Sequence, residues 1–216
     1  MMENVGTLYS YWRSSAAYRV RIALALKGLS YDTAFVHLVN GGGEQHSPEY
    51  KSLNAQGLVP SWQDEEGVLT QSLAIIEYIN DCHPDTPLLP AAPFARAKVR
   101  AMAQAIACEI HPINNLRVLK YLRTSVGLDD DAVNSWYQHW VSEGLGALEL
   151  MVEDDGFCYG NTPSLADICL IPQLYNARRF NVDLTIYPKL CRIEANCLQL
   201  EAFKQAVPET QADAQL

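Results

Sequence analysis

Hydrophobic residues follow two different patterns along the 216-residue chain, and the change between them falls near residue 90. In the first part, short apolar segments alternate with segments of helical spacing. Val5–Trp12 is rich in β-branched and aromatic residues and predicts a strand. Val20–Leu26 has the apolar spacing of a helix, which Lys27-Gly28 closes. The chain therefore opens with a strand followed directly by a helix.

The next segments complete a small mixed sheet with helices on it. Tyr31–Leu38 predicts a second strand, and a Gly41-Gly42-Gly43 loop leads to a short helical stretch near residues 47–53. Two further short strands and a helix follow, at Leu58–Trp62, Val68–Thr70 and Ser72–Cys82, with a turn at Asp64–Gly67 between the strands. This order of elements predicts an α/β domain over residues 1–84.

A proline-rich segment separates this domain from a helical one. Four prolines between Pro84 and Pro93 cannot continue a helix or an inner strand, which predicts an interdomain linker over residues 85–94. From Ala95 onward, apolar residues recur every three or four positions, at Val99, Met102, Ile106, Ile110 and Ile113, and later at Trp136, Trp140, Leu145, Leu148 and Met151. We expect an all-helical domain over residues 95–216.

Two features of this helical half carry structural expectations. Ser164-Leu165-Ala166-Asp167 has the form of a capping box and precedes the apolar run Ile168–Ile171. It predicts the start of a centrally buried helix, with Asp167 serving as a cap rather than in chemistry. The polar residues after Val207 predict a frayed tail.

Composition narrows the classes of partner. The formal net charge of −9 argues against nucleic acid and against an anionic membrane, since both reward an excess of Lys and Arg. The six cysteines show no zinc-like spacing, no apolar run approaches the roughly 18 residues of a membrane span, and Met1–Asn4 does not resemble a signal peptide. We expect a cytoplasmic, reduced protein without a metal, whose small anionic substrate needs local cationic groups.

Ser14 and Ser15 stand where the first strand turns into the first helix. At this N-cap the first backbone N–H groups are unpaired and the helix dipole presents its positive end. A thiolate held there by one hydroxyl would gain about 1.5–3 kcal/mol from the hydrogen bond and roughly 0.3–1 kcal/mol from the dipole. Such a site lowers a thiol pKa by about one to three pH units. The alternative is that Ser14 only caps the helix.

Two later segments add binding groups at strand ends. Leu53–Pro60 leaves a helix and enters a strand, and a cis Val59–Pro60 bond would expose the backbone of Val59 to an extended peptide. An ordinary trans turn is the alternative. Gln71-Ser72 begins a second helix, whose N-terminus suits a carboxylate. One helix N-terminus thus suits a thiolate and the other a carboxylate.

Six segments together resemble the zeta-class glutathione transferases, the family that includes maleylacetoacetate isomerases. They read SSAAYRVRIALALKG, NAQGLVP, QSLAIIEYI, IHPINNLRVLKYL, PSLADI and ARRFNVDLTIYP, and the resemblance extends from Leu8 to about Phe203. NAQGLVP and PSLADI alone indicate only the wider glutathione transferase superfamily. The resemblance implies a thioredoxin-like N-terminal domain, an all-α C-terminal domain, a homodimer and glutathione as the cofactor.

The resemblance also implies roles for individual residues. Ser14 matches the catalytic serine, and Ser15, which supports the same helix start, is a second candidate for the catalytic and glutathione-binding contact to the thiolate. Arg179 matches the arginine for a substrate carboxylate, and Arg13 is a second candidate because guanidinium groups suit carboxylates. This chain has Ala16 where the family usually has Cys, which excludes a mechanism using that thiol. Positions that contact glutathione are matched by Gln45, Val59, Gln71, Ser72, His111 and Asn115, with Val59 acting through its backbone.

The helical spacing bears on three of these residues. On one continuous helix, His111 and Asn115 lie about 40° apart and share a face, so they could serve one site. Arg117 lies some 160° beyond Asn115 on an ideal helix. It is therefore a weaker substrate-binding candidate, and a solvated or interface charge is its alternative role.

The resemblance implies a glutathione-dependent cis–trans isomerase acting on a maleyl diketo acid, maleylacetoacetate first and maleylpyruvate second. In that reaction the thiolate held by Ser14 adds to the cis double bond, the resulting single bond rotates, and the thiol is lost again. Two alternatives stay open: a conjugating or dehalogenating glutathione transferase, and a non-catalytic binding module in which Ser14 is only a cap.

Overall fold

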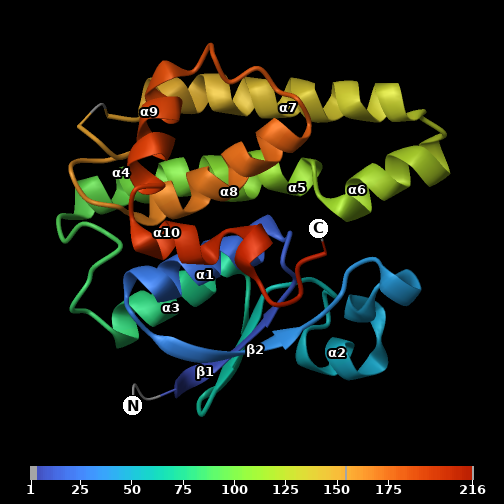
Figure 1. The fold of residues 1–216 in the computed structure, drawn as a ribbon, viewed down its shortest axis with the longest axis horizontal. Coiled ribbons are helices and arrows are strands. Elements are labelled where there is room, and N and C mark those ends of the chain that lie inside the picture. Colours follow the sequence, from blue (N-terminus) through green and yellow to red (C-terminus); the bar gives the residue numbers. More distant parts are fainter. Residues whose placement is uncertain (1–3, 154, 216) are drawn as a thin grey trace. The chain divides into compact units, whose positions relative to one another are not determined.

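The computed structural model describes residues 4–153 and 155–215. The chain folds into two compact units (Figure 1). The first comprises Met1–Leu88 together with Gln199–Leu216, and the second comprises Leu89–Leu198. The change from one unit to the other falls inside the proline-rich segment. The C-terminal residues belong to the α/β unit, whereas the sequence analysis assigned them to the helical domain.

The α/β unit is built on a four-stranded mixed sheet in the order β2-β1-β3-β4. Its strands are β1 (Asn4–Ser10), β2 (Ser30–Phe35), β3 (Ser61–Asp64) and β4 (Gly67–Thr70). β1 pairs parallel with β2 and antiparallel with β3, and β3 pairs antiparallel with β4. The mixed sheet predicted from the sequence is confirmed, although β1 and β2 end two to three residues earlier than expected.

Three helices of this unit lie where the sequence predicts helices: α1 (Ser15–Leu26), α2 (Pro48–Leu53) and α3 (Ser72–Cys82). The unit also contains α10 (Glu201–Ala206) and the 3-10 turns η1 (Asn40–Gly42), η2 (Glu44–His46) and η5 (Pro208–Thr210). Figure 1 shows α10 running beside α1, and the two helices are in contact. The helix predicted over Ser72–Cys82 is confirmed at both ends.

Buried Arg21 of α1 ties the start of this helix to the C-terminal part of the unit. Its side chain is 2% exposed and donates to the Ala206 carbonyl at 3.1 Å, to the Trp12 carbonyl at 3.0 Å and to Ser10 Oγ at 3.3 Å. A buried cation needs such partners, because desolvation without them is costly. Arg21 therefore joins three chain segments at one point.

The helical unit is centred on α8 (Leu165–Arg179), most of whose residues are buried. The capping box at Ser164 and the burial of Ile168–Ile171 are both confirmed. The remaining helices are α4 (Pro93–Gln104), α5 (His111–Ile113), α6 (Leu116–Tyr121), α7 (Asp130–Met151) and α9 (Pro188–Cys197), with π-helical turns η3 (Ala105–Ile110) and η4 (Leu122–Val126).

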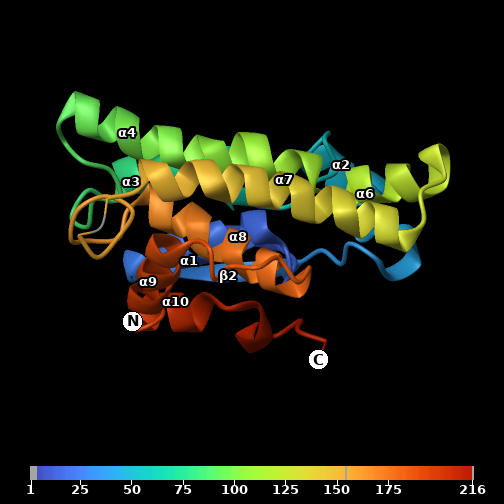
Figure 2. The same ribbon diagram turned by 90° about the horizontal axis from the view of Figure 1, so that it is seen from above.

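Helix α7 packs closely against a neighbouring helical segment. Figure 2 shows α7 lying alongside the stretch formed by α4 and η3. A Cβ added at Gly144 would meet Ile110 Cγ1 at 2.2 Å, so the glycine allows this approach. Trp140 and Met151, which share the apolar periodicity of this helix, are exposed. The buried residues of α7 are Val133, Tyr137, Val141, Leu145 and Leu148.

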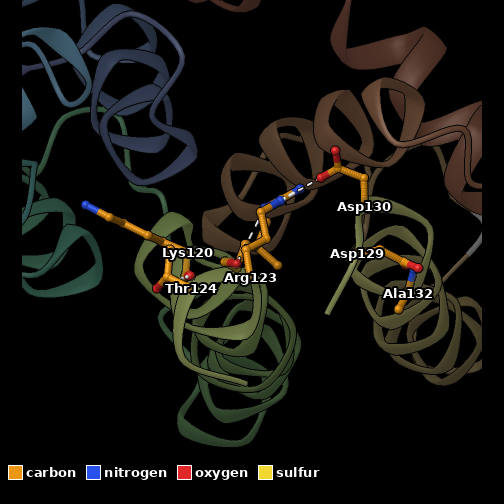
Figure 3. A network of polar contacts seen from close by, with 7 residues as sticks. Lys120, Arg123, Thr124, Asp129, Asp130 and Ala132 are labelled. Carbon is orange, nitrogen blue, oxygen red and sulfur yellow. Dashed lines mark hydrogen bonds and ion pairs between the residues drawn. The ribbon is translucent and has the colours of Figure 1, made fainter. Parts of the chain in front are cut away.

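The turn between η4 and α7 is held by surface polar contacts (Figure 3). Arg123 Nε lies 2.8 Å from Asp130 Oδ1, and Asp129 caps α7 by accepting from the Ala132 N–H at 2.8 Å. These side chains are exposed, and an exposed pair of this kind contributes about 0–1 kcal/mol. The cluster therefore shapes a turn rather than a site.

The polar tail is ordered, which corrects the frayed end predicted from the sequence. After α10 it forms η5, and the Gln211 side chain donates to the Val207 carbonyl at 2.9 Å and to the Gln205 carbonyl at 3.1 Å. Local side-chain bonds, together with the buried Pro208, thus hold this segment. No helix in the described part of the chain is long and apolar enough to cross a membrane.

Candidate active site

Three segments that carry predicted site residues meet at one edge of the sheet. β1 and β4 both pair antiparallel with β3, so they run in the same direction and end at the same edge. Ser61, the first residue of β3, pairs with Tyr9 near the end of β1 and with Thr70 at the end of β4. α1 and α3 therefore begin at the edge where the Val59–Pro60 segment enters β3. Strand ends of this kind are the usual ligand sites of α/β sheets.

Ser14 is the N-cap of α1 and retains a donor for a ligand. Its Oγ accepts a hydrogen bond from the Ala17 N–H at 3.2 Å, and its side chain is half-buried. Within residues 4–153 and 155–215, no acceptor for the Ser14 hydroxyl proton is found. Capping uses a lone pair of the oxygen and leaves the proton, so the two roles considered for Ser14 are compatible.

The neighbours of Ser14 differ in their exposure. Ser15 is 5% exposed, so its hydroxyl faces the protein interior. Arg13 is exposed, and its guanidinium carbon lies 4.7 Å from the centre of the Trp12 ring. This cation–π contact orients the guanidinium group while leaving its N–H donors for a carboxylate.

The Val59–Pro60 peptide bond is cis, and two side chains hold the loop before it. Tyr50 Oη donates to the Leu58 carbonyl at 2.7 Å, and Asn54 Nδ2 donates to the same carbonyl at 2.8 Å. In the part of the chain that the structure describes, no hydrogen bond engages the backbone N–H or carbonyl of Val59. An extended peptide could pair with these two groups.

The start of α3 offers uncapped backbone donors. Gln71 occupies the N-cap position without a side-chain cap bond, and its φ of 72° lies in the left-handed region that disfavours non-glycine residues. Strain of this kind gathers at functional sites. Ser72 is 6% exposed, and its Oγ accepts from Arg19 NH1 at 3.2 Å. The dipole of α3, its uncapped N–H groups and the buried guanidinium group of Arg19 together favour the binding of an anion at this helix start.

Gln45 is turned toward its own loop rather than toward the other predicted residues. It lies in η2, is 7% exposed, and donates through Nε2 to the Leu38 carbonyl at 3.3 Å. Its Oε1 is buried, and within the described residues it has no hydrogen-bond partner. A buried acceptor without a partner is costly, which suits a position completed by a ligand.

His111 and Asn115 do not lie on one continuous helix, so the shared-face prediction is wrong. α5 ends at Ile113, and Asn115 has an extended backbone with φ −66° and ψ 150°. Asn115 is the N-cap of α6, and its Oδ1 accepts from the Arg117 N–H at 3.1 Å. Pro112 stands at the start of α5, and Asn114, two residues later, is the C-cap of the helix. The π-helical turn η3 directly precedes His111.

Arg178 and Arg179 at the end of α8 have different surroundings. Arg178 forms an ion pair with Glu194 of α9, a carboxylate that is largely buried, and therefore joins two helices. Arg179 is exposed and donates to Asn176 Oδ1 at 3.3 Å. Burial raises the pKa of the neighbouring Tyr137, and the charge of Arg179 partly offsets this. Both arginines are exposed, but the guanidinium group of Arg178 is paired with the Glu194 carboxylate, whereas that of Arg179 donates to a neutral amide oxygen.

Several contributors were missed because their function depends on tertiary contacts. Arg19, Tyr50 and Asn54 hold Ser72 or the Leu58 carbonyl, yet nothing in their sequence spacing predicts this. The one signal in the sequence was that Arg19 and Arg21 are charged residues within an otherwise apolar helix, where a buried cation needs polar partners. Among the described residues, no group of three or more His, Cys, Asp or Glu side chains could hold a metal ion.

The fold and this sheet edge define the class of protein as a glutathione S-transferase. Residues 4–81 match the family described as glutathione S-transferase, N-terminal domain. More particularly, the chain belongs to the zeta-class family of maleylacetoacetate isomerases. It is 47% identical to a maleylacetoacetate isomerase of Pseudomonas aeruginosa, over 95% of this chain and 97% of the relative.

Solved structures agree with this family. A holo maleylpyruvate isomerase, described as a bacterial zeta-class glutathione S-transferase, superposes with a TM-score of 0.93 at 45% identity, covering 97% of this chain and all of the other. A maleylacetoacetate isomerase from Methylobacterium extorquens, solved with malonate and glutathione bound, gives a TM-score of 0.92 at 39% identity, with the same coverage. These similarities extend through both units of the chain.

Proposed function

We propose that the protein catalyses a glutathione-dependent cis–trans isomerisation of a maleyl diketo acid, with maleylacetoacetate as the first candidate and maleylpyruvate as the second. The observation that carries this proposal is the pair of helix starts at one sheet edge, one with an available Ser14 hydroxyl and the other with uncapped N–H groups. One similar protein is named maleylacetoacetate isomerase and another maleylpyruvate isomerase, and both names support this class of reaction.

The residues present at the sheet edge fit glutathione. When bound, glutathione supplies the thiol that adds to the cis double bond and leaves after rotation. The Ser14 hydroxyl donates to the sulfur and favours its anionic form. Ser72 accepts from Arg19 and so keeps its own proton for a carboxylate, beside the first N–H groups of α3. The backbone of Val59 pairs with the peptide part.

Cationic side chains serve the substrate in this proposal. Arg13 and Arg179 are exposed guanidinium groups suited to carboxylates. His111 and Asn115 are further glutathione contacts, and Arg117, exposed in the first turn of α6, is a weaker substrate contact. Ala16 supplies no thiol, so ionisation of the bound sulfur depends on Ser14 rather than on a cysteine beside it.

The decisive experiment incubates the purified protein with each acid and a catalytic amount of glutathione. Isomerisation gives the trans acid and leaves glutathione undiminished. A conjugating or dehalogenating transferase would instead consume glutathione in step with product. Failure to turn over either acid would refute the isomerase activity. Failure to bind glutathione in calorimetry would also refute the glutathione site, so that only the assignment of the fold would stand.

We further place the protein in the cytoplasm as a homodimer. The six cysteines are all free, and Cys158, Cys169 and Cys197 are buried as thiols, which suits a reducing compartment. Fractionation of cells and sedimentation of the purified protein test these two statements independently of the activity.

A further inference from the structure

The C-terminal segment contacts the turn that leads to Ser14. Like α10, residues 207–215 belong to the α/β unit, and Figure 1 shows this red segment close to the blue turn before α1. Asp213 Oδ2 accepts a hydrogen bond from the Trp12 N–H at 3.0 Å. These two residues are 201 positions apart in the chain, so the contact is a tertiary one.

Charged side chains hold both backbone groups of Trp12. The Asp213 carboxylate accepts a hydrogen bond from the Trp12 N–H, and Arg21 NH2 donates to the Trp12 carbonyl at 3.0 Å. Trp12 lies inside a turn closed by the bond from the Ser14 N–H to the Tyr11 carbonyl at 2.9 Å. Bonds to charged groups are about twice as strong as neutral ones, so this turn is fixed from both sides.

Packing reinforces the same contact. Ala214 packs against a hydrophobic cluster that contains Tyr11, Trp12, Tyr50 and Val59. The cluster thus includes residues from the turn before Ser14 and from the cis-proline segment. The Trp12 ring also carries the guanidinium group of Arg13, whose carbon lies 4.7 Å from the ring centre.

We propose that Asp213 is a positioning residue for the reaction: by holding the Trp12 peptide it fixes the direction of the Ser14 hydroxyl and of the Arg13 guanidinium. This inference rests on the proposed function. The C-terminal segment then acts as part of the active-site loop rather than as a tail. Loss of the Asp213 oxygen lets the turn relax, so that Ser14 holds the sulfur anion less well.

The test compares Asp213→Ala with Asp213→Asn, because asparagine keeps an oxygen acceptor for the Trp12 N–H and alanine does not. Asp32→Ala, on the exposed face of β2, is the matched control for loss of one surface carboxylate. Each variant is titrated by the ultraviolet absorbance of bound glutathione thiolate, and kcat and KM are measured for the isomerisation. Urea midpoints show whether each variant is folded.

For Asp213→Ala we expect kcat/KM to fall about tenfold, the loss that one hydrogen bond to a charged group carries. The fall should be mainly in kcat, and the pKa of bound thiol should rise. Asp213→Asn and Asp32→Ala should stay within about twofold of the parent. An unchanged thiol pKa and kcat in a folded Asp213→Ala variant would overturn the inference. A parent without a thiolate band would instead refute the proposed function itself.

Discussion

Ser14 and Ser164 are both helix N-cap residues, and the two serines have different surroundings. Ser14 at the start of α1 is half-buried and accepts one hydrogen bond, from the Ala17 N–H. Ser164 at the start of α8 is 5% exposed, and its N–H and hydroxyl both donate to Asp167 Oδ2 at 2.8 Å. The hydroxyl proton of Ser164 is therefore donated within the protein, whereas that of Ser14 is available to a ligand.

The comparison teaches that the residue type and its position on the helix do not by themselves decide the role. Both serines are favoured N-cap residues. At α8 the carboxylate of Asp167 also accepts from the Cys158 N–H at 2.7 Å, so the polar groups satisfy one another inside the core. At α1 the proton of Ser14 is left for a ligand. Satisfied polar groups stabilise, and available ones can bind.

The largest expected effect is on stability, at the α8 cap. Asp167→Ala removes the acceptor of three buried donors, the Cys158 N–H and the N–H and O–H of Ser164. Each unsatisfied buried donor costs roughly 1–3 kcal/mol, so we expect a loss of about 3–5 kcal/mol in free energy of unfolding. A fall in the urea midpoint measures this. Exposed Asp155→Ala is the control, and equal midpoints for the two variants would contradict the capping role.

At Ser14 the expected effect is on activity instead. Ser14→Ala removes the hydroxyl donor and should lower kcat/KM for isomerisation by about 10²-fold, as loss of one preorganised donor does. Its stability cost should stay near 1 kcal/mol, the usual cost of losing an N-cap. Steady-state kinetics and urea unfolding of the same sample measure both.

Ser14→Asp separates capping from catalysis. Aspartate caps a helix as well as serine does, but it offers no donor and adds a negative charge beside the sulfur. We expect parental stability together with activity at least as low as that of Ser14→Ala. Full activity in this variant would mean that Ser14 is only a cap.

The sequence predicts the elements well where local signals decide them. The Ser14 and Ser164 caps, the α3 bounds and the mixed sheet follow from turn residues and apolar periodicity. The apolar periodicity does not by itself give the buried face of α7, since Trp140 and Met151 are exposed and the close approach of Ile110 to Gly144 is a tertiary contact. Tertiary packing of this kind leaves no periodic signal.

The candidate site could be predicted only in part, for the same reason. Ser14 and Ser72 stand out because each begins a helix after a strand. The shared face of His111 and Asn115 assumed a continuous helix, but the helix ends at Ile113 and a new one starts after Asn115. Asp213 lies 201 residues from its partner, in a polar segment with the composition of a frayed end. Only the folded chain brings it to Trp12.

A smaller effect is expected at the second helix start of the sheet edge. Ser72→Ala removes one donor to a ligand carboxylate, while the uncapped N–H groups of α3 remain. We expect KM for glutathione to rise about tenfold with kcat within about twofold, because the lost contact serves binding equally in ground and transition states. Ser72→Thr keeps the hydroxyl and should restore KM. A fall confined to kcat would place Ser72 in the chemistry instead.

The smallest effect is expected in the alkylation of Cys158, whose N–H donates to Asp167 at the α8 cap. It tests whether the surroundings of Ser164 are closed to solvent, in contrast to those of Ser14. Burial, followed by the charge of Asp167, raises the pKa of Cys158, and burial raises that of Cys197. These thiols stay protonated as the pH rises from 7 to 9, whereas an exposed thiol ionises over that range. Mass spectrometry after alkylation should therefore find the exposed Cys82 and Cys108 labelled, with Cys158 unlabelled at both pH values. Labelling of Cys158 in the parent protein would show that the start of α8 exposes this thiol to the reagent and would contradict the prediction. Labelling only in Asp167→Ala would show that the Asp167 carboxylate keeps Cys158 buried.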